Sequence, residues 1–155
     1  LLQYQDFTNC CTWKLNLRRI LGPTPLEIAE AELEAAIDNS ATANANFTTF
    51  IDDNNASWPL LDSNGVPITT NWSAGLTPEE RAIKAAYYWK IRSDLERTKG
   101  NDYYADTYLR YSQLWLNSGA VTSNARDTYN DLVQAIEDAA QAVEDAQTAV
   151  TDLGG

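Results

Sequence analysis

Apolar residues recur along much of the chain at intervals of three and four, the spacing of one face of an α-helix. From residue 25 this spacing continues to about residue 53 and predicts one long helix, with a break near Ser40 as the alternative. Residues 24–27 (Thr-Pro-Leu-Glu) match a capping box with Pro in the first turn, which is typical of a helix start. The repeating positions are Ala29, Leu33, Ala36, Ser40, Ala43, Phe47 and Phe50.

Two shorter helices are predicted in the second half of the chain. Residues 77–80 (Thr-Pro-Glu-Glu) repeat the capping pattern, and Gly100 suits the position after a helix end, so we expect a helix up to residue 99. A third helix is expected over 102–117. Its stripe is aromatic, and we expect that stripe to form an aromatic core against the preceding helix. The repeating positions are Ile83, Tyr87, Ile91 and Leu95 in the second helix, and Tyr104, Tyr108, Tyr111 and Trp115 in the third.

The clearest periodicity lies in residues 122–153, where apolar residues keep a heptad register that is typical of a coiled coil. The acidic side chains of this segment fall on the outer positions of the heptad. Ala at flanking positions widens the apolar face, which favours a close-packed multi-helix bundle over an isolated dimer. The a positions are Thr122, Tyr129, Ile136, Val143 and Val150, and the d positions are Ala125, Leu132, Ala139, Ala146 and Leu153.

The remaining segments lack a settled helical period. Residues 1–24 are expected to form an N-terminal arm with aromatic and basic side chains. Residues 54–76 are expected to form an irregular insertion with a short hairpin, in which Asn64 and Gly65 supply the positive φ angles of a tight turn. We therefore predict a mainly α protein. Residues 25–155 form a three- to four-helix bundle with a long C-terminal heptad helix, the arm precedes it, and the hairpin-bearing insertion interrupts it.

Composition and charge narrow the range of functions. The chain has 155 residues, with 22 acidic and 11 basic side chains, no His and a formal net charge of −11. A hydrophobic content of 44% is enough for a core and excludes a disordered acidic tail. So acidic a chain is a poor nucleic-acid binder, because that binding depends on Lys and Arg neutralising phosphates. No apolar run reaches the roughly 18 residues of a membrane span. We expect neither a direct nucleic-acid partner nor a membrane.

The candidate catalytic and metal-binding groups have simpler explanations. Without His, the chain has no Ser-His-Asp triad and no imidazole metal ligand. Glu30 and Glu34 have the spacing of an ordinary solvent-facing helix surface, and Asp52 and Asp53 are the other carboxylate pair. Residues 62–65 (Asp-Ser-Asn-Gly) begin like an EF-hand loop, but its sixth position is Pro rather than Gly. We expect no catalytic residue, no metal site and no cofactor, and we predict that the protein is not an enzyme.

The cysteines and the glycosylation sequons do not distinguish between the possible functions. Cys10 and Cys11 are adjacent and are the only cysteines, so no disulfide framework is available. We expect two free thiols, with a redox or intermolecular role as the alternative. The three sequons, at Asn46, Asn55 and Asn71, matter only if the chain passes through a eukaryotic secretory route.

Aromatic side chains gather in one part of the chain. Eight of the sixteen lie between residues 87 and 115, and those beside the predicted packing faces are expected to be exposed in a monomer. Tyr and Trp with basic neighbours are typical anchors of protein interfaces. A sugar- or base-stacking platform is the alternative, and it requires a groove. The candidate partner interface comprises Tyr4, Phe7, Trp13, Arg18 and Arg19 in the arm, and Tyr88, Trp89 and Tyr103 in the helical region.

Residues 61–68 (Leu-Asp-Ser-Asn-Gly-Val-Pro-Ile) resemble the short Asp-x-Asn-Gly turns of fibre and tail proteins of tailed bacteriophages. The Asn- and Thr-rich composition and the long Ala-rich heptad helix are also similar to such virion proteins. The resemblance implies a multi-copy structural role in the virion, such as a head–tail connector, neck or tail-associated subunit. It covers one short turn, so it assigns no functional residue.

The sequence therefore predicts a non-enzymatic structural or assembly protein of a multi-subunit particle. Its expected partners are other copies of the chain, other subunits of the same assembly, or both. A secreted or lumenal helical accessory subunit of a larger complex is the alternative, which glycan on a sequon would indicate. A third interpretation is an acidic DNA mimic that occupies a basic groove with its outer carboxylates.

Overall fold

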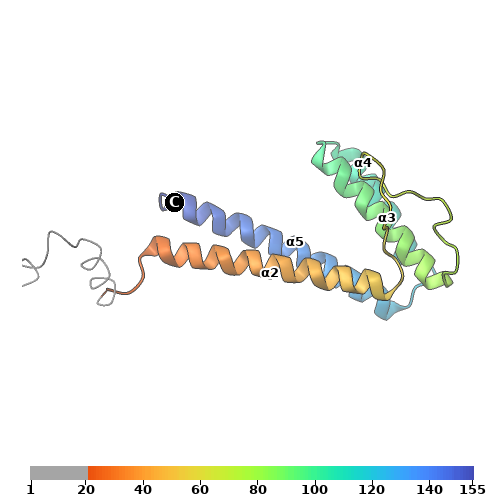
Figure 1. The fold of residues 1–155 in the computed structure, drawn as a ribbon, viewed down its shortest axis with the longest axis horizontal. Helices are drawn as coiled ribbons and strands as arrows, with labels where there is room; N and C mark the ends of the chain where they lie inside the picture. The colour runs from red at the N-terminus through yellow and green to blue at the C-terminus, as the bar shows by residue number, and fades with distance from the viewer. Residues whose placement is uncertain (1–20) are drawn as a thin grey trace, which may run out of the picture. The chain divides into compact units, whose positions relative to one another are not determined.

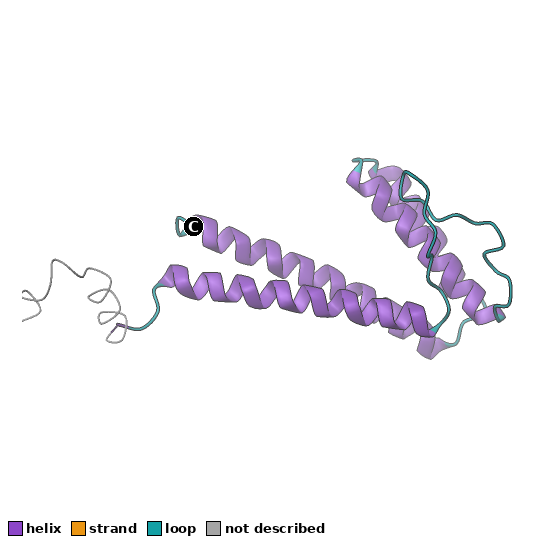
Figure 2. Ribbon diagram, viewed as in Figure 1, coloured by secondary structure: helices purple, strands orange, loops and turns teal. Residues whose placement is uncertain are grey.

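The computed structural model describes residues 21–155 and confirms the prediction of a mainly α protein (Figures 1 and 2). The described residues form no strand. Two pairs of helices pack side by side, α2 with α5 and α3 with α4 (Figure 1). The predicted arm contacts of Tyr4, Phe7, Trp13, Arg18 and Arg19, and the state of Cys10 and Cys11, lie outside the described residues. The helices are α2 Pro25–Asp53, α3 Pro78–Thr98, α4 Asp102–Leu116 and α5 Ser123–Asp152.

Both predicted capping boxes are present. At the start of α2, the Thr24 hydroxyl accepts from the backbone N–H of Glu27 at 3.2 Å, and the Glu27 carboxylate accepts from the backbone N–H of Thr24 at 2.9 Å. Thr77 and Glu80 make the same reciprocal pair ahead of α3. Each box satisfies backbone donors that a helix start leaves without partners. The alternative of a break near Ser40 is wrong, because α2 is continuous from Pro25 to Asp53.

The described chain divides into two compact units. The first unit comprises residues 21–42 and 136–155, which are parts of α2 and α5. Ala29 and Val150 are buried in this unit, and the predicted stripe and heptad positions between them are half-buried, whereas the acidic residues other than the capping Glu27 are exposed. The predicted inward face is therefore the observed one, except at Leu153, which is exposed next to the chain end. Supercoiling of the two helices as a coiled coil stays a prediction.

The second unit comprises residues 43–135. Its aromatic centre is the buried ring of Phe47, which meets Tyr87 edge-on at 5.5 Å and Tyr129 at 5.3 Å. These contacts join α2, α3 and α5 within this unit. Burial raises the pKa of the Tyr129 hydroxyl, and the neighbouring Ser112 hydroxyl offsets this only in part. A buried edge-to-face cluster of this kind contributes both area burial and ring–ring attraction.

Small residues join α3 to α4. Ser93 donates to the carbonyl of Ala105 at 2.7 Å, and Ser112 donates to the carbonyl of Ala86 at 2.8 Å. All four residues are buried. Ala and Ser allow two helix backbones to approach closely, and the two hydroxyls find acceptors across the contact rather than remaining unsatisfied. The connection between the helices is short, and Gly100 has the positive φ of +77° that favours glycine.

The predicted packing face of α4 is wrong at its centre, although two of its rings, Tyr108 and Tyr111, meet Trp89 of α3 at 5.2 and 5.0 Å. The side buried against α3 is formed by Ala105, Ser112 and Leu116, whereas Tyr104, Tyr111 and Trp115 are exposed. Large rings do not fit where two helices approach through Ala and Ser, so Tyr104 and Trp115 lie to the outside and Tyr111 meets α3 only at the edge of the contact. Tyr108, the remaining member of the predicted stripe, is half-buried at the edge of this contact.

The insertion over 54–76 is irregular, as predicted, and its hairpin is reduced to a single antiparallel bridge between Leu61 and Pro67. The turn is set by Asp62, whose carboxylate accepts from two backbone N–H groups, and by Gly65 at φ +79°. Asn64, the other residue expected at positive φ, does not adopt it. Among residues 21–155, no helix is both long and apolar enough to cross a membrane.

Candidate aromatic binding surface

The outward side of α4 is unusually apolar. Five large side chains are exposed there, and Tyr103 and Leu114 keep 75% and 68% of their accessible surface. At 100° per residue these side chains share one side of the helix with Thr107, and the charged residues of α4 lie outside that sector. We call this surface the α4 outer face. Its members are Tyr103, Tyr104, Tyr111, Leu114 and Trp115.

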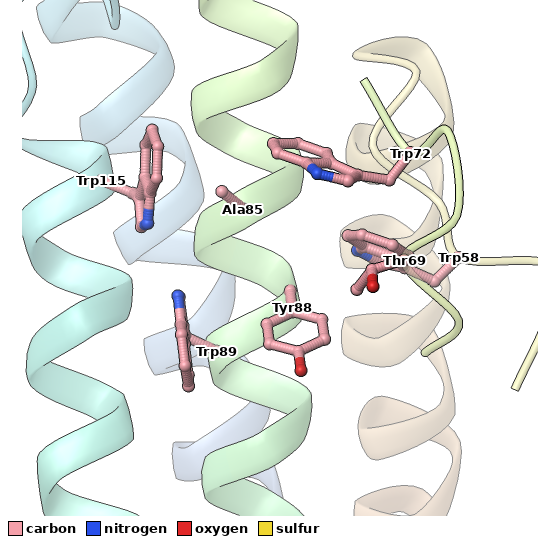
Figure 3. Close-up of a pocket in the computed structure, with 7 residues that line it drawn as sticks. All are labelled: Trp58, Thr69, Trp72, Ala85, Tyr88, Trp89 and Trp115. Atoms are coloured by element: carbon pink, nitrogen blue, oxygen red, sulfur yellow. The ribbon is translucent and has the colours of Figure 1, made fainter. Parts of the chain in front are cut away.

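Next to the α4 outer face lies an aromatic pocket of about 310 Å³ (Figure 3). Three elements of the second unit build it: the insertion, one side of α3 and the end of α4. In Figure 3 the rings of Trp58 and Trp72 stand on one side of α3, and those of Trp89 and Trp115 stand on the other, with Ala85 between them. The lining residues are Trp58, Thr69, Trp72, Ala85, Tyr88, Trp89 and Trp115.

Specific contacts hold the insertion against α3. The indole N–H of Trp58 donates to the backbone carbonyl of Lys84 at 3.1 Å, and the Lys84 ammonium lies 4.8 Å from the centre of the Trp58 ring. Partial burial lowers the pKa of Lys84. At the start of α3, the Asn55 side-chain amide donates to Glu80 at 3.0 Å. The pocket wall supplied by the insertion is therefore fixed by its own hydrogen bonds.

Ring contacts continue from the pocket along α3 and α4. Trp58 stacks on Trp72 at 5.9 Å and meets Tyr88 at 5.4 Å, and Tyr88 meets Trp89 at 5.0 Å. Arg92 reinforces the series, since it donates to the Tyr88 hydroxyl at 2.9 Å. Through these contacts the pocket and the α4 outer face form one continuous aromatic surface. The further ring contacts are those of Trp89 with Tyr108 and Tyr111, of Tyr108 with Tyr104 and Tyr111, and of Tyr103 with Tyr104.

The structure separates the predicted interface residues of the helical region. Tyr103 is exposed, as expected, but Tyr88 and Trp89 are half-buried and line the pocket. The expectation of exposure is wrong for these two, because Trp58 of the insertion packs on Tyr88, and Tyr108 and Tyr111 of α4 pack on Trp89. Sequence reasoning missed Trp58 and Trp72. Their presence in a segment without helical periodicity was the available indication, since a large apolar ring in a loop needs a surface to cover.

The carboxylates considered as catalytic or metal-binding groups do not form a site in the described residues. Glu30, Glu34, Asp52 and Asp53 are all exposed on α2. Within residues 21–155, no three His, Cys, Asp or Glu side chains are grouped so that they could hold a metal ion. No protein-family model, curated protein or solved structure matches this chain.

Proposed function

We propose that the chain is a non-enzymatic assembly subunit of a multi-subunit particle, and that it associates through the α4 outer face. The observation that carries this proposal is the inverted amphipathicity of α4. Ala105 and Ser112 are buried, whereas Tyr103 and Leu114 are among the most exposed large side chains of the described chain. Large apolar side chains that face solvent would gain free energy if a partner covered them, so such a helix surface is typical of an interface.

The size of the effect supports an interface. Complete burial of one Leu or aromatic side chain is worth roughly 1.5–3 kcal/mol. Tyr103 and Leu114 keep most of their surface exposed, so a partner that covers both would gain about 2–4 kcal/mol from these two side chains. Tyr and Trp are also the residue types that dominate the energy of protein interfaces. One charged group reaches the face, because the Arg110 guanidinium at its edge donates to the Thr107 hydroxyl at 3.3 Å, and a partner would have to leave this guanidinium solvated or pair it.

We further propose that the particle is a virion and that the chain is a head–tail connector, neck or tail-associated subunit. The support is the resemblance of residues 61–68 to turns of tailed-bacteriophage proteins, together with the long Ala-rich α5. The partners under this proposal are other copies of the chain, other subunits of the particle, or both.

Native mass spectrometry of the chain from its source tests the proposal. A discrete multimer with unmodified mass is expected, and Tyr103→Ala combined with Leu114→Ala should weaken association by at least about tenfold. A matched control, Leu60→Ala combined with Ile68→Ala, removes two exposed apolar side chains of the insertion and should leave association unchanged. A monomer, or a multimer that is insensitive to the α4 substitutions, contradicts the proposal. Glycan mass on Asn46, Asn55 or Asn71 would support the secreted or lumenal alternative.

A further inference from the structure

The aromatic pocket has the properties of a ligand site. Its volume of about 310 Å³ lies at the lower end of the range for ligand pockets. Its walls are held in place before any ligand enters, because Trp58 is hydrogen-bonded to the Lys84 carbonyl and Tyr88 accepts from Arg92. A preorganised site loses little side-chain entropy on binding, so most of the contact energy remains available for affinity.

The pocket walls are mainly ring faces. Trp58 and Trp72 are stacked with an interplanar angle of 27°, and Tyr88 tilts by 54° from the Trp58 ring. Trp89 and Trp115 stand on the opposite side of α3 from Trp58 and Trp72 in Figure 3. Such walls suit a ligand that presents flat, apolar rings or ring edges.

The hydrogen-bonding groups of the pocket are mainly donors. Apart from Thr69 and Ala85, every lining side chain is aromatic, and none is a carboxylate or an amide. The nitrogen-bearing edges of the Trp89 and Trp115 rings face each other in Figure 3. Neither of these indole N–H groups donates to another group within residues 21–155. A fitting ligand therefore brings acceptors and few donors.

The charges beside the pocket are positive, although the chain as a whole is strongly acidic. The Lys84 ammonium lies 4.8 Å from the centre of the Trp58 ring, and the Arg92 guanidinium lies 5.8 Å from the centre of the Tyr88 ring. These cations already occupy ring faces that would otherwise attract a cationic ligand. The complementary ligand is neutral or acidic.

We propose that this pocket binds a neutral or acidic proline-rich segment of a partner protein in the polyproline II conformation. Proline rings pack flat on aromatic faces, and proline has no backbone N–H, so its backbone offers acceptors without donors. The polyproline II helix has no internal hydrogen bonds, which leaves its carbonyls free to accept from Trp89 and Trp115. Its preformed shape also lowers the entropic cost of docking in an aromatic groove.

Two other ligand classes fit less well. A sugar presents several hydroxyl donors as well as acceptors, and among the lining side chains only the hydroxyls of Thr69 and Tyr88 could receive them, the second of which already accepts from Arg92. A quaternary ammonium suits an aromatic cage, but here it would meet the charges of Lys84 and Arg92. Both classes serve as competing outcomes of the test.

The pocket and the α4 outer face share Trp115, but pocket binding does not require self-association. The two proposals therefore fail separately. Tyr103→Ala lies outside the pocket and is expected to weaken association while leaving peptide affinity unchanged.

The test is a titration of the full chain with an acetylated decaproline peptide, followed by tryptophan fluorescence and calorimetry. Saturable binding is expected, and it should weaken at least about tenfold in Trp72→Ala, which removes one ring of the stacked wall. Trp89→Phe and Trp115→Phe keep a ring but lose the N–H donor, and each should weaken binding by about threefold to tenfold. These conservative variants decide the question if Trp72→Ala fails to fold, as judged by circular dichroism.

Several results would overturn the proposal. The first is that decaproline shows no saturable binding at about millimolar concentration. The second is that a Gly-Ser decapeptide binds equally well. The third is that affinity is unchanged in a folded Trp72→Ala variant, or in both Trp89→Phe and Trp115→Phe. Tighter binding of a chitooligosaccharide would assign the pocket to sugars instead. Tighter binding of tetramethylammonium would assign it to quaternary ammonium ligands.

Discussion

The close contact between α3 and α4 makes a sharp prediction at Ser112. This side chain is 1% exposed, and it donates to the Ala86 carbonyl at 2.8 Å across the contact. Ser112→Leu inserts a large side chain where the two helices meet through small residues. Overpacking of this kind costs about 1–3 kcal/mol, and loss of the buried hydrogen bond adds about 0.5–1.5 kcal/mol. We therefore expect a loss of about 2–4 kcal/mol in the free energy of unfolding.

Two matched variants separate bulk from hydrogen bonding. Ser112→Ala loses the same hydrogen bond without adding bulk and should cost only about 0.5–1.5 kcal/mol. Arg110→Leu adds a leucine on the exposed side of the same helix and should change stability by no more than about 0.5 kcal/mol.

The measurement is urea unfolding followed by tryptophan fluorescence in a Trp13→Phe background, which reports on residues 43–135 because the other four of the five Trp all lie there. If Ser112→Leu proves no less stable than Ser112→Ala, the two helices do not exclude large side chains. The steric account of the outward aromatic face of α4 would then be refuted.

Three further predictions concern the core, a helix cap and pH. Tyr129 is 2% exposed and packs on Phe47, so Tyr129→Ala should lower the free energy of unfolding by about 3–5 kcal/mol in urea titrations, whereas Tyr129→Phe should change it far less. Thr77→Ala removes the cap of α3 and should cost about 0.5–2 kcal/mol in the same assay. Hydrogen bonds from the Thr77 backbone and from Asn55 hold the pKa of Glu80 below its ordinary value of 4.5. Glu80 therefore stabilises the fold fully above about pH 4.5, and this stabilisation is lost as pH falls through the lower, folded-state pKa. Acid should then destabilise the wild type more than Glu80→Gln. Parallel curves of stability against pH for the two proteins would contradict this.

An unbroken series of ring contacts links the aromatic pocket to the α4 outer face. A partner that covers α4 and presents a proline-rich segment would engage both features through Trp115. Binding through two linked contacts gains affinity without any new contact type, because the second contact forms at a high effective concentration. Separate substitution of Tyr103 and Trp72 distinguishes these contributions.

The sequence by itself determined the local structure. The boxes at residues 24–27 and 77–80 placed two helix starts correctly, and the 4-3 spacing placed the inward face of α2. Gly65 and Gly100 marked two turns that require positive φ. These features depend on residues within a few positions of one another, whose hydrogen bonds and backbone angles are set by local chemistry.

Only the tertiary structure decided which side of α4 is buried and where the pocket lies. Helical periodicity assigns Tyr104 and Trp115 to one side of the helix, but it carries no information on how closely a neighbouring helix approaches. The approach of α3 through Ala and Ser excluded the larger rings from the centre of the contact. The pocket likewise depends on the insertion folding back, which brings Trp58 to the Lys84 carbonyl across 26 residues of sequence. Contacts between distant segments follow from the packing of the whole unit, and a local pattern in the sequence does not specify them.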